Sequence, residues 1–257
     1  MVVAALLHVG TPAVAQTLSP SPDTFRTPPK EVTAPQGRFL THLIEDTLID
    51  FKRLPSEETL TLLGIGATIA AIGGPADRPS SNMMSSSRAL EDVFAPGESL
   101  GGARMQLAGA AATYIIGRAA GHGRISELGA DLLRAQFVTQ ALTAAVKLTA
   151  KRQRPDGTMY SFPSGHSSVS FATATVLQRH FGWKVGAPAY GFATYIAASR
   201  LQEKRHFLSD VAFGAAVGIA VGRTVTIGRG DKQFAVTPMA VPGGGGVSFN
   251  WVGGNKP

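Results

Sequence analysis

Apolar residues recur at helical spacing along most of the chain, in runs separated by polar or glycine-rich segments. Between Gly37 and Lys52 they repeat every three to four residues, the spacing of an amphipathic helix, and Pro55 ends this segment. Eighteen uncharged residues follow, from Thr59 to Ala76. This pattern predicts an all-α protein, a single bundle of about six core helices. Further helices are predicted at 104–120, 125–152, 166–181, 186–200 and 206–227.

Two segments depart from the helical pattern. Residues 77–103 are rich in Ser, Gly and Pro, which predicts a long loop with one short helix near Ser87 to Val93. Residues 231–257 form a C-terminal tail in which two short β-prone runs flank four glycines, so we expect a terminal β-hairpin there.

The N-terminal region is predicted to contain a leader and a linker that precede the helical domain. Residues 1–15 are apolar and end in Ala-Val-Ala, the small-x-small pattern of a signal-peptidase site. No Lys or Arg precedes the apolar run, so a short buried helix is the alternative. Residues 16–37 contain five prolines and predict an extended linker. We therefore expect an exported protein of the bacterial periplasm or cell envelope, whose helical domain spans residues 38–230.

The lengths of the uncharged runs bear on membrane insertion. Within the predicted helices these runs are 12 to 15 residues long, whereas a spanning helix needs about 20 apolar residues. Only Thr59 to Ala76 comes near that length. We therefore expect a soluble bundle or one associated with the membrane surface. Because small residues also suit packed membrane bundles, the integral-membrane alternative stays open.

Three polar segments between Lys147 and Asp210 carry the candidate chemistry. In the first, Lys147 and Arg154 are seven residues apart, which predicts that both cations lie on one side of a helix end that Pro155 terminates. Lys151 would share this face as a third cation. The alternative is a solvated basic helix end that complements the helix dipole.

The second segment contains Pro163, Ser164, Gly165 and His166 before a helical pattern. Ser164 is a candidate N-cap, so free backbone N–H groups at the helix start would point toward an anion. Gly165 would let the backbone approach that anion, and His166 would stand in the first turn beside it. Alone, this motif is equally typical of an ordinary capped helix.

The third segment places His206 and Asp210 four residues apart, so on a helix the carboxylate would accept a hydrogen bond from one imidazole nitrogen. Such a pair activates a nucleophile or a general base. Arg200 is expected at the end of the preceding helix, where its guanidinium would bind two phosphate oxygens. A His/Asp pair alone is more often a surface pair.

Together the three segments resemble the signature of the type 2 phosphatidic acid phosphatase superfamily, which includes bacterial class A acid phosphatases and vanadium-dependent haloperoxidases. The resemblance implies that His206 is a nucleophile that forms a phosphohistidine, that Asp210 orients it, and that His166 is the general acid and base. It also implies that no metal or other cofactor is needed. The residues expected to bind the phosphoryl group are Lys147, Arg154, Ser164, Gly165 and Arg200.

The charge of the chain agrees with an anionic substrate. The net charge is +7, and nine of the 24 Lys and Arg residues lie between Lys147 and Arg205. Nucleic acid is a poor alternative, since aromatic residues make up only 7% of the chain and no reader motif is present. We therefore expect a metal-independent phosphatase acting on a lipid phosphate, an isoprenoid pyrophosphate or a soluble ester. The alternatives are a vanadate-dependent haloperoxidase and a non-catalytic envelope protein that binds anions. We expect residues 77–103 and 156–163 to form the pocket walls.

Overall fold

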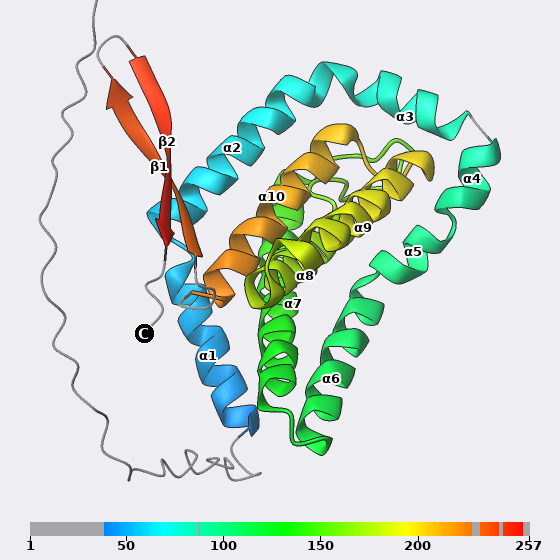
Figure 1. Ribbon diagram of the computed structural model, residues 1–257. Helices are drawn as coiled ribbons and strands as arrows, with labels where there is room; N and C mark the ends of the chain where they lie inside the picture. Colours follow the sequence, from blue (N-terminus) through cyan, green and yellow to red (C-terminus); the bar gives the residue numbers. More distant parts are fainter. Residues whose placement is uncertain (1–38, 87, 228–231, 242–243, 254–257) are drawn as a thin grey trace, which may run out of the picture. The chain divides into compact units, whose positions relative to one another are not determined.

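The computed structural model describes residues 39–86, 88–227, 232–241 and 244–253. The predicted signal peptide and linker lie outside these residues. Within the described part, the regular elements up to residue 225 are all helices (Figure 1). Its elements are α1 (Phe39–Arg53), α2 (Glu57–Gly73), the 3₁₀ turn η2 (Gly74–Ala76), α3 (Asp77–Ser85), α4 (Arg88–Phe94), α5 (Pro96–Gly101), α6 (Ala103–Ala119), α7 (Gly123–Ala150), α8 (Gly165–Phe181), α9 (Trp183–Gln202), α10 (Leu208–Val225), β1 (Lys232–Val241) and β2 (Gly244–Gly253).

The all-α prediction is confirmed, and the long helices begin and end within a few residues of their predicted bounds. The prediction of a long loop at 77–103 is wrong, because this segment forms α3, α4 and α5 and raises the helix count above six. Local signals support these short helices: Asp77 lies in the first turn of α3, and Pro96 occupies the first turn of α5.

Helix α8 lies between α7, α9 and α10, and α10 packs in turn against α2 (Figure 1). The close approach of α10 to α8 depends on small residues. A Cβ added at Gly218 would lie 2.2 Å from the carbonyl oxygen of Ser168, and one at Gly214 would lie 2.6 Å from the carbonyl oxygen of Ser164. Gly222, four residues further, meets Thr175 in the same way. This glycine stripe brings the start of α10 against the start of α8, where two of the three signature segments lie.

The core between α7, α8 and α10 is built mainly from Ala, Val and Leu side chains, among them Leu132, Val138, Val176 and Val217. One charged cluster interrupts it. Arg134 of α7 forms ion pairs with Asp131 at 2.9 Å and with Asp50 of α1 at 3.3 Å. Asp50 is fully buried, and burial raises the pKa of its carboxyl group to about 6.

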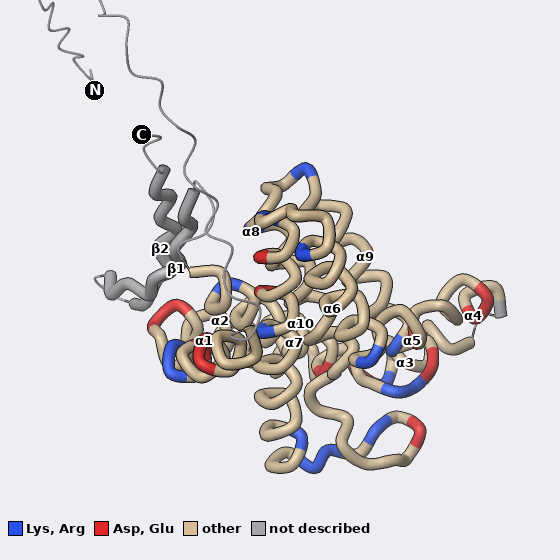
Figure 2. The backbone as a smooth tube through the Cα atoms, turned by 90° about the horizontal axis from the view of Figure 1, so that it is seen from below, with Lys and Arg blue, Asp and Glu red and all other residues tan. Residues whose placement is uncertain are grey.

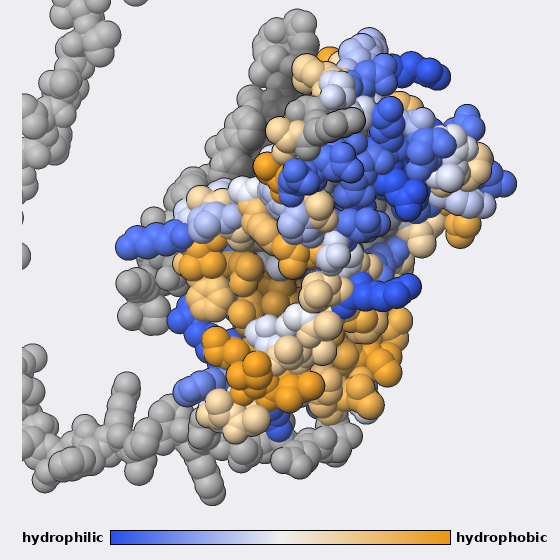
Figure 3. Space-filling view, turned by 90° about the vertical axis from the view of Figure 1, so that its right-hand side faces the viewer, coloured by the Kyte–Doolittle hydropathy of each residue, from blue (hydrophilic) through white to orange (hydrophobic). Residues whose placement is uncertain are grey.

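Lys, Arg, Asp and Glu lie mainly near the ends of the helices (Figure 2). On the face shown in Figure 3, hydrophilic residues gather at the upper end, while apolar residues cover the region below. Exposed apolar side chains of α6 and α9 include Met105, Ile115, Ile116 and Phe192. Two helical stretches are long and apolar enough to cross a membrane, Glu57–Ser85 and Leu208–Val225. Only 17% of the apolar window in the first stretch is buried, against 61% in the second.

The two strands pair antiparallel, with Phe234 opposite Trp251. Each strand has ten residues, which is longer than the short runs expected, and β2 begins inside the glycine run.

Candidate functional site

The three signature segments converge where α7 ends and where α8 and α10 begin. Helix α7 ends at Ala150 because Lys151 adopts the left-handed conformation, with φ of 44°. Arg154 therefore lies in the following loop, and the prediction that it shares a helix face with Lys147 and Lys151 is wrong. Lys147 is in the last turn of α7, whereas the exposed Lys151 turns the chain away from the helix.

The loop between α7 and α8 is held by its own hydrogen bonds and by the third segment. The backbone N–H of Arg154 donates to the carbonyl of Thr158 at 2.7 Å, and the N–H of Ser161 donates to the carbonyl of Arg152 at 2.8 Å. Asp156 forms an ion pair with Arg205 at 3.0 Å. These contacts fix Arg154 without any helical hydrogen bond.

Ser164 is the N-cap of α8, as predicted, and its Oγ accepts a hydrogen bond from the N–H of Ser167 at 3.4 Å. Its own N–H donates to the backbone carbonyl of Asp210 at 3.0 Å, which joins the second and third segments. Gly165 follows as the first residue of α8. A Cβ there would come no closer than 3.9 Å to another residue, so packing alone does not require glycine.

His166 and Arg200 meet beside this helix start. The Nε2 atom of His166 lies 3.0 Å from the carbonyl oxygen of Glu98 in α5 and 3.4 Å from a terminal nitrogen of Arg200. Burial and the positive charge of Arg200 lower the pKa of His166 to about 4. Arg200 lies near the end of α9, as predicted, is 2% exposed, and forms an ion pair with Glu203.

His206 and Asp210 face each other, but their predicted geometry needs correction. Phe207 is the N-cap of α10, so His206 lies in the turn before this helix and only Asp210 is inside it. The Nδ1 atom of His206 is 3.6 Å from Oδ2 of Asp210, which is longer than a hydrogen bond. Both side chains are buried, and burial lowers the pKa of His206. Because Nδ1 is directed at the carboxylate, Nε2 is the ring nitrogen that remains for chemistry.

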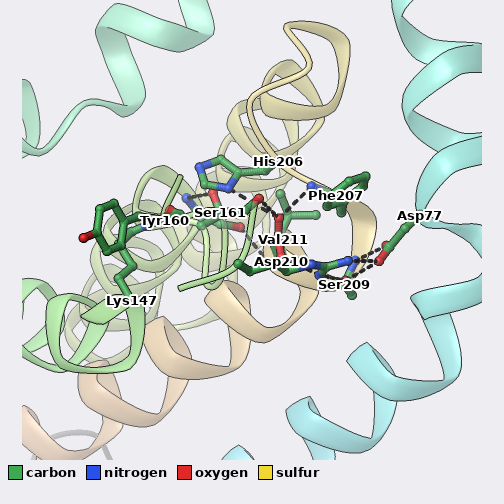
Figure 4. Close-up of polar contacts among 12 residues, drawn as sticks. Asp77, Lys147, Tyr160, Ser161, His206, Phe207, Ser209, Asp210 and Val211 are labelled. Atoms are coloured by element: carbon green, nitrogen blue, oxygen red, sulfur yellow. Dashed lines mark hydrogen bonds and ion pairs between the residues drawn. The ribbon is translucent and has the colours of Figure 1, made fainter. Parts of the chain in front are cut away.

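Three hydrogen-bond donors fix the Asp210 carboxylate, and none of them is His206 (Figure 4). Its Oδ2 atom accepts hydrogen bonds from the N–H of Phe207, at 2.8 Å, and from the hydroxyl of Ser161. Its Oδ1 atom accepts one from Arg152 at 2.7 Å. Because both oxygens of the carboxylate are hydrogen-bonded, the group cannot rotate. Oδ2 is therefore held as the oxygen that faces His206.

Arg152 and Asp77 are members of this arrangement that sequence reasoning did not identify. Arg152 donates through its other terminal nitrogen to Asp77 at 2.7 Å, and Asp77 also accepts from the N–H of Ser209 at 2.8 Å and from its hydroxyl at 2.7 Å (Figure 4). Arg152 stacks over the ring of Phe207, 4.4 Å from its centroid. Asp77 stands 132 residues before Ser209, so no local spacing reveals the contact.

The cations form one electrostatic cluster around His206. Burial is the main cause of the lowered pKa of His206, and the positive charges of Lys147 and Arg154 lower it further. Burial and the neighbouring Arg154 lower the pKa of Lys147 to about 8, and its amino group donates to the carbonyl of Tyr160 at 2.7 Å. The Nε atoms of Arg154 and Arg200 are buried and have no hydrogen-bond partner among the described residues. Such donors suit an anionic ligand.

Within the part of the chain that the structure describes, no group of three or more His, Asp or Glu side chains is arranged to hold a metal ion.

Comparison with known proteins matches residues 156–233 to the PAP2 superfamily. The chain is 45% identical over 84 residues to the lipid A 1-phosphatase of Porphyromonas gingivalis, covering 30% of this chain and 18% of that protein. It is 32% identical over 109 residues to the decaprenylphosphoryl-5-phosphoribose phosphatase of Mycobacterium tuberculosis, covering 38% and 60%. The chain thus spans less than two thirds of these relatives. The crystal structure of Aquifex aeolicus LpxE superposes with a TM-score of 0.51 at 22% identity, over 58% of this chain and 93% of that one, and shares the fold.

Proposed function

We propose that this chain, a member of the PAP2 superfamily, is a metal-independent phosphatase that works through a phosphohistidine on His206. The observation that carries the proposal is the geometry around this residue. Its Nδ1 atom faces a carboxylate that three other groups fix, and the positive charges of Lys147 and Arg154 act on the ring. A histidine held this way has one nitrogen aimed by a neighbour and the other beside donors for phosphate oxygens.

In the first step, Nε2 of His206 attacks the phosphorus atom and the bond to the leaving oxygen breaks. The leaving oxygen takes a proton from His166, whose ring lies against Arg200. Asp210 stabilises the positive charge that develops on the His206 ring. Lys147, Arg154 and Arg200, with the N–H groups at the start of α8, stabilise charge on the three non-bridging oxygens.

In the second step, His166 takes a proton from a water molecule, which attacks the phosphohistidine. The phosphorus–nitrogen bond breaks, inorganic phosphate leaves, and both histidines return to their starting state. In this structure Nε2 of His166 lies within hydrogen-bond distance of the backbone carbonyl of Glu98. The leaving oxygen would replace that carbonyl as the hydrogen-bond partner of His166.

A lipid phosphate is the substrate class with the best support, and we place the helical domain in or on a membrane. On the face shown in Figure 3, a hydrophilic end adjoins a surface of apolar residues, and the described helices carry many exposed apolar side chains. Two helical stretches have the length and composition of spans, and the first is mostly exposed. The two relatives described above are named for lipid A and for a decaprenyl-linked phosphate. Side chains like Ile115 and Ile116, both more than 60% exposed, are costly in water and stable in lipid.

The test is to trap the intermediate with p-nitrophenyl phosphate labelled on phosphorus, in detergent and with EDTA present. Its leaving group needs no protonation, so His166→Ala should still form the phosphoenzyme and then hydrolyse it slowly, giving a burst of one equivalent. The label should be stable in alkali and map to residue 206. His206→Ala should give neither label nor turnover, while the exposed His42→Ala serves as the control. Label on another residue, or turnover by His206→Ala, would refute the proposal.

A further inference from the structure

A cavity of about 200 Å³ lies beside the candidate site, between α3 and the loop that carries Arg154. Phe207, the neighbour of the proposed nucleophile, forms another part of its wall. The cavity is smaller than the 300–1,000 Å³ typical of sites for drug-sized ligands, so it suits one compact group and not a whole head group or an acyl chain. Its remaining lining comes from Arg78, Ser81, Asn82, Gln153, Pro155 and Gly157.

The cavity wall is cationic. Its lining residues include Arg78 and Arg154, and none of them is an Asp or a Glu. The two acidic residues next to it in sequence are committed elsewhere, since Asp77 binds Arg152 and Asp156 binds Arg205. Within the described part of the chain, Arg78 has no ion-pair partner. A small cavity with two positive charges and no negative one favours an anion.

Buried polar atoms at the cavity lack partners. The hydroxyl of Ser81, a residue that is 2% exposed, forms no hydrogen bond with any described residue, and neither does the buried Nε atom of Arg154. Leaving such groups unpaired is unfavourable, so a ligand with hydrogen-bonding oxygens would be stabilised here. This observation is independent of the charge of the wall.

We propose that this cavity is a subsite for a second anionic group of the substrate, with Arg78 and Ser81 as its specificity residues. The proposal rests on the proposed function, because Arg154 would lie between the two sites and contact the scissile phosphoryl group as well. The substrate class is then a phosphate whose leaving group carries another phosphate or a carboxylate within a few bonds of the scissile phosphorus atom. A diphosphate is the simplest example.

The experiment compares the monophosphate and the diphosphate of one isoprenoid alcohol, using the full chain in detergent micelles. The quantity measured is the ratio of kcat/KM for the diphosphate to that for the monophosphate. Arg78→Gln should lower this ratio about fivefold, as expected for loss of one partly solvated ion pair. Arg104→Gln removes an equally exposed arginine from the start of α6, which is not part of the cavity, and should leave the ratio unchanged.

Ser81→Ala supplies a second readout. The change removes a hydroxyl that has no partner in the protein, so thermal stability should be retained or increased while the ratio falls. An unchanged ratio in both cavity variants would overturn the subsite, as would an equal loss for both substrates. If the wild-type protein hydrolyses neither substrate, the proposed function fails instead. A diphosphate preference matched by an ester bearing a carboxylate at the same distance would show that charge, and not phosphate itself, is recognised.

Discussion

Arg152 does not contact the substrate in the proposed mechanism. Its removal should nevertheless disturb the His206–Asp210 pair more than any other single substitution. It lies between two buried carboxylates, 2.7 Å from Asp77 and 2.7 Å from Asp210, and 2.6 Å from the hydroxyl of Ser209. Arg152→Gln would leave both carboxylates without their shared cation. Its side chain is 33% exposed, so water would offset part of the loss. Breaking a buried pair costs about 3–5 kcal/mol, which makes the lower end of that range the expected loss of stability.

Asp77→Asn is the milder change and keeps the protein folded for assay. The amide replaces the carboxylate at equal size, and we expect it to cost about 1–3 kcal/mol of stability. It leaves the charge of Arg152 directed at Asp210 alone, which weakens the ability of that carboxylate to stabilise charge on His206. We expect kcat to fall about tenfold, or about 1.4 kcal/mol in the barrier, with KM nearly unchanged.

The pH dependence distinguishes this role from a structural one. In the proposed mechanism His206 must be neutral to attack phosphorus, so the acidic limb of kcat/KM should follow its pKa. Asp77→Asn adds net positive charge and should move this limb to lower pH. Arg152→Gln adds net negative charge and should move it to higher pH, and the double variant should return it toward the wild type.

The assay is the pH–rate profile of each variant beside its thermal unfolding temperature. Arg118→Gln is the control, because it removes an exposed arginine in the last turn of α6 that does not contact Asp210. Limbs that move in the same direction, or rates that follow unfolding temperature alone, would refute the reasoning. Arg152→Lys should recover part of the activity, since one ammonium can bind one carboxylate but not bridge two at fixed geometry.

Three further expectations follow from burial and packing. The pKa of His166 in the free protein is about 4, and a bound phosphate dianion favours its protonated ring. The alkaline limb of the kcat/KM profile should therefore lie at lower pH than the alkaline limb of the kcat profile. Coincident limbs in the two profiles would contradict this. Gly218→Ala should destabilise the protein by about 1–3 kcal/mol or more, because its Cβ would meet Ser168, whereas Gly191→Ala, with open space around it, should be neutral or stabilising in thermal unfolding. The raised pKa of Asp50 means that the folded state binds more protons than the unfolded state between about pH 4 and 6. Stability should therefore fall as pH rises through this window, and Asp50→Asn should abolish that slope.

The sequence predicted the helices well because their apolar spacing is local. It failed at 77–103, where Ser, Gly and Pro indicated a loop but helix-starting residues such as Asp77 and Pro96 prevailed. It also placed Arg154 beside Lys147 on one side of a helix end, since the left-handed turn at Lys151 has no glycine to mark it. Such a turn is set by the loop contacts that follow, which no window of sequence contains.

The same division holds at the site. Ser164 as a helix cap and the pairing of His206 with Asp210 follow from short spacings, although the helix in which that pair was expected begins only after His206. Roles for these residues remain proposals. Arg152 lies inside the first signature segment and is one of the nine Lys and Arg residues counted between Lys147 and Arg205. That count does not distinguish it from the other cations. Its orientation toward Asp210 depends on a partner from a distant helix, and that information appears only in the fold.

That partner changes the interpretation of the N-terminal helices. Asp77 begins α3 directly after α2 and η2, in the stretch Glu57–Ser85 that has the length and composition of a membrane span. The same stretch supplies Arg78 and Ser81 to the cavity. Helix α2 packs along α10, whose first turn holds Asp210, so the stretch from α2 to α3 contacts α10 near both of its ends. A displacement of this element would alter the Asp77–Arg152 contact and the cavity together. We therefore expect nucleophile orientation and selectivity between monophosphate and diphosphate to change in parallel when the packing of α2 against α10 is perturbed, for example at Gly66, where an added Cβ would lie 2.2 Å from Ala216.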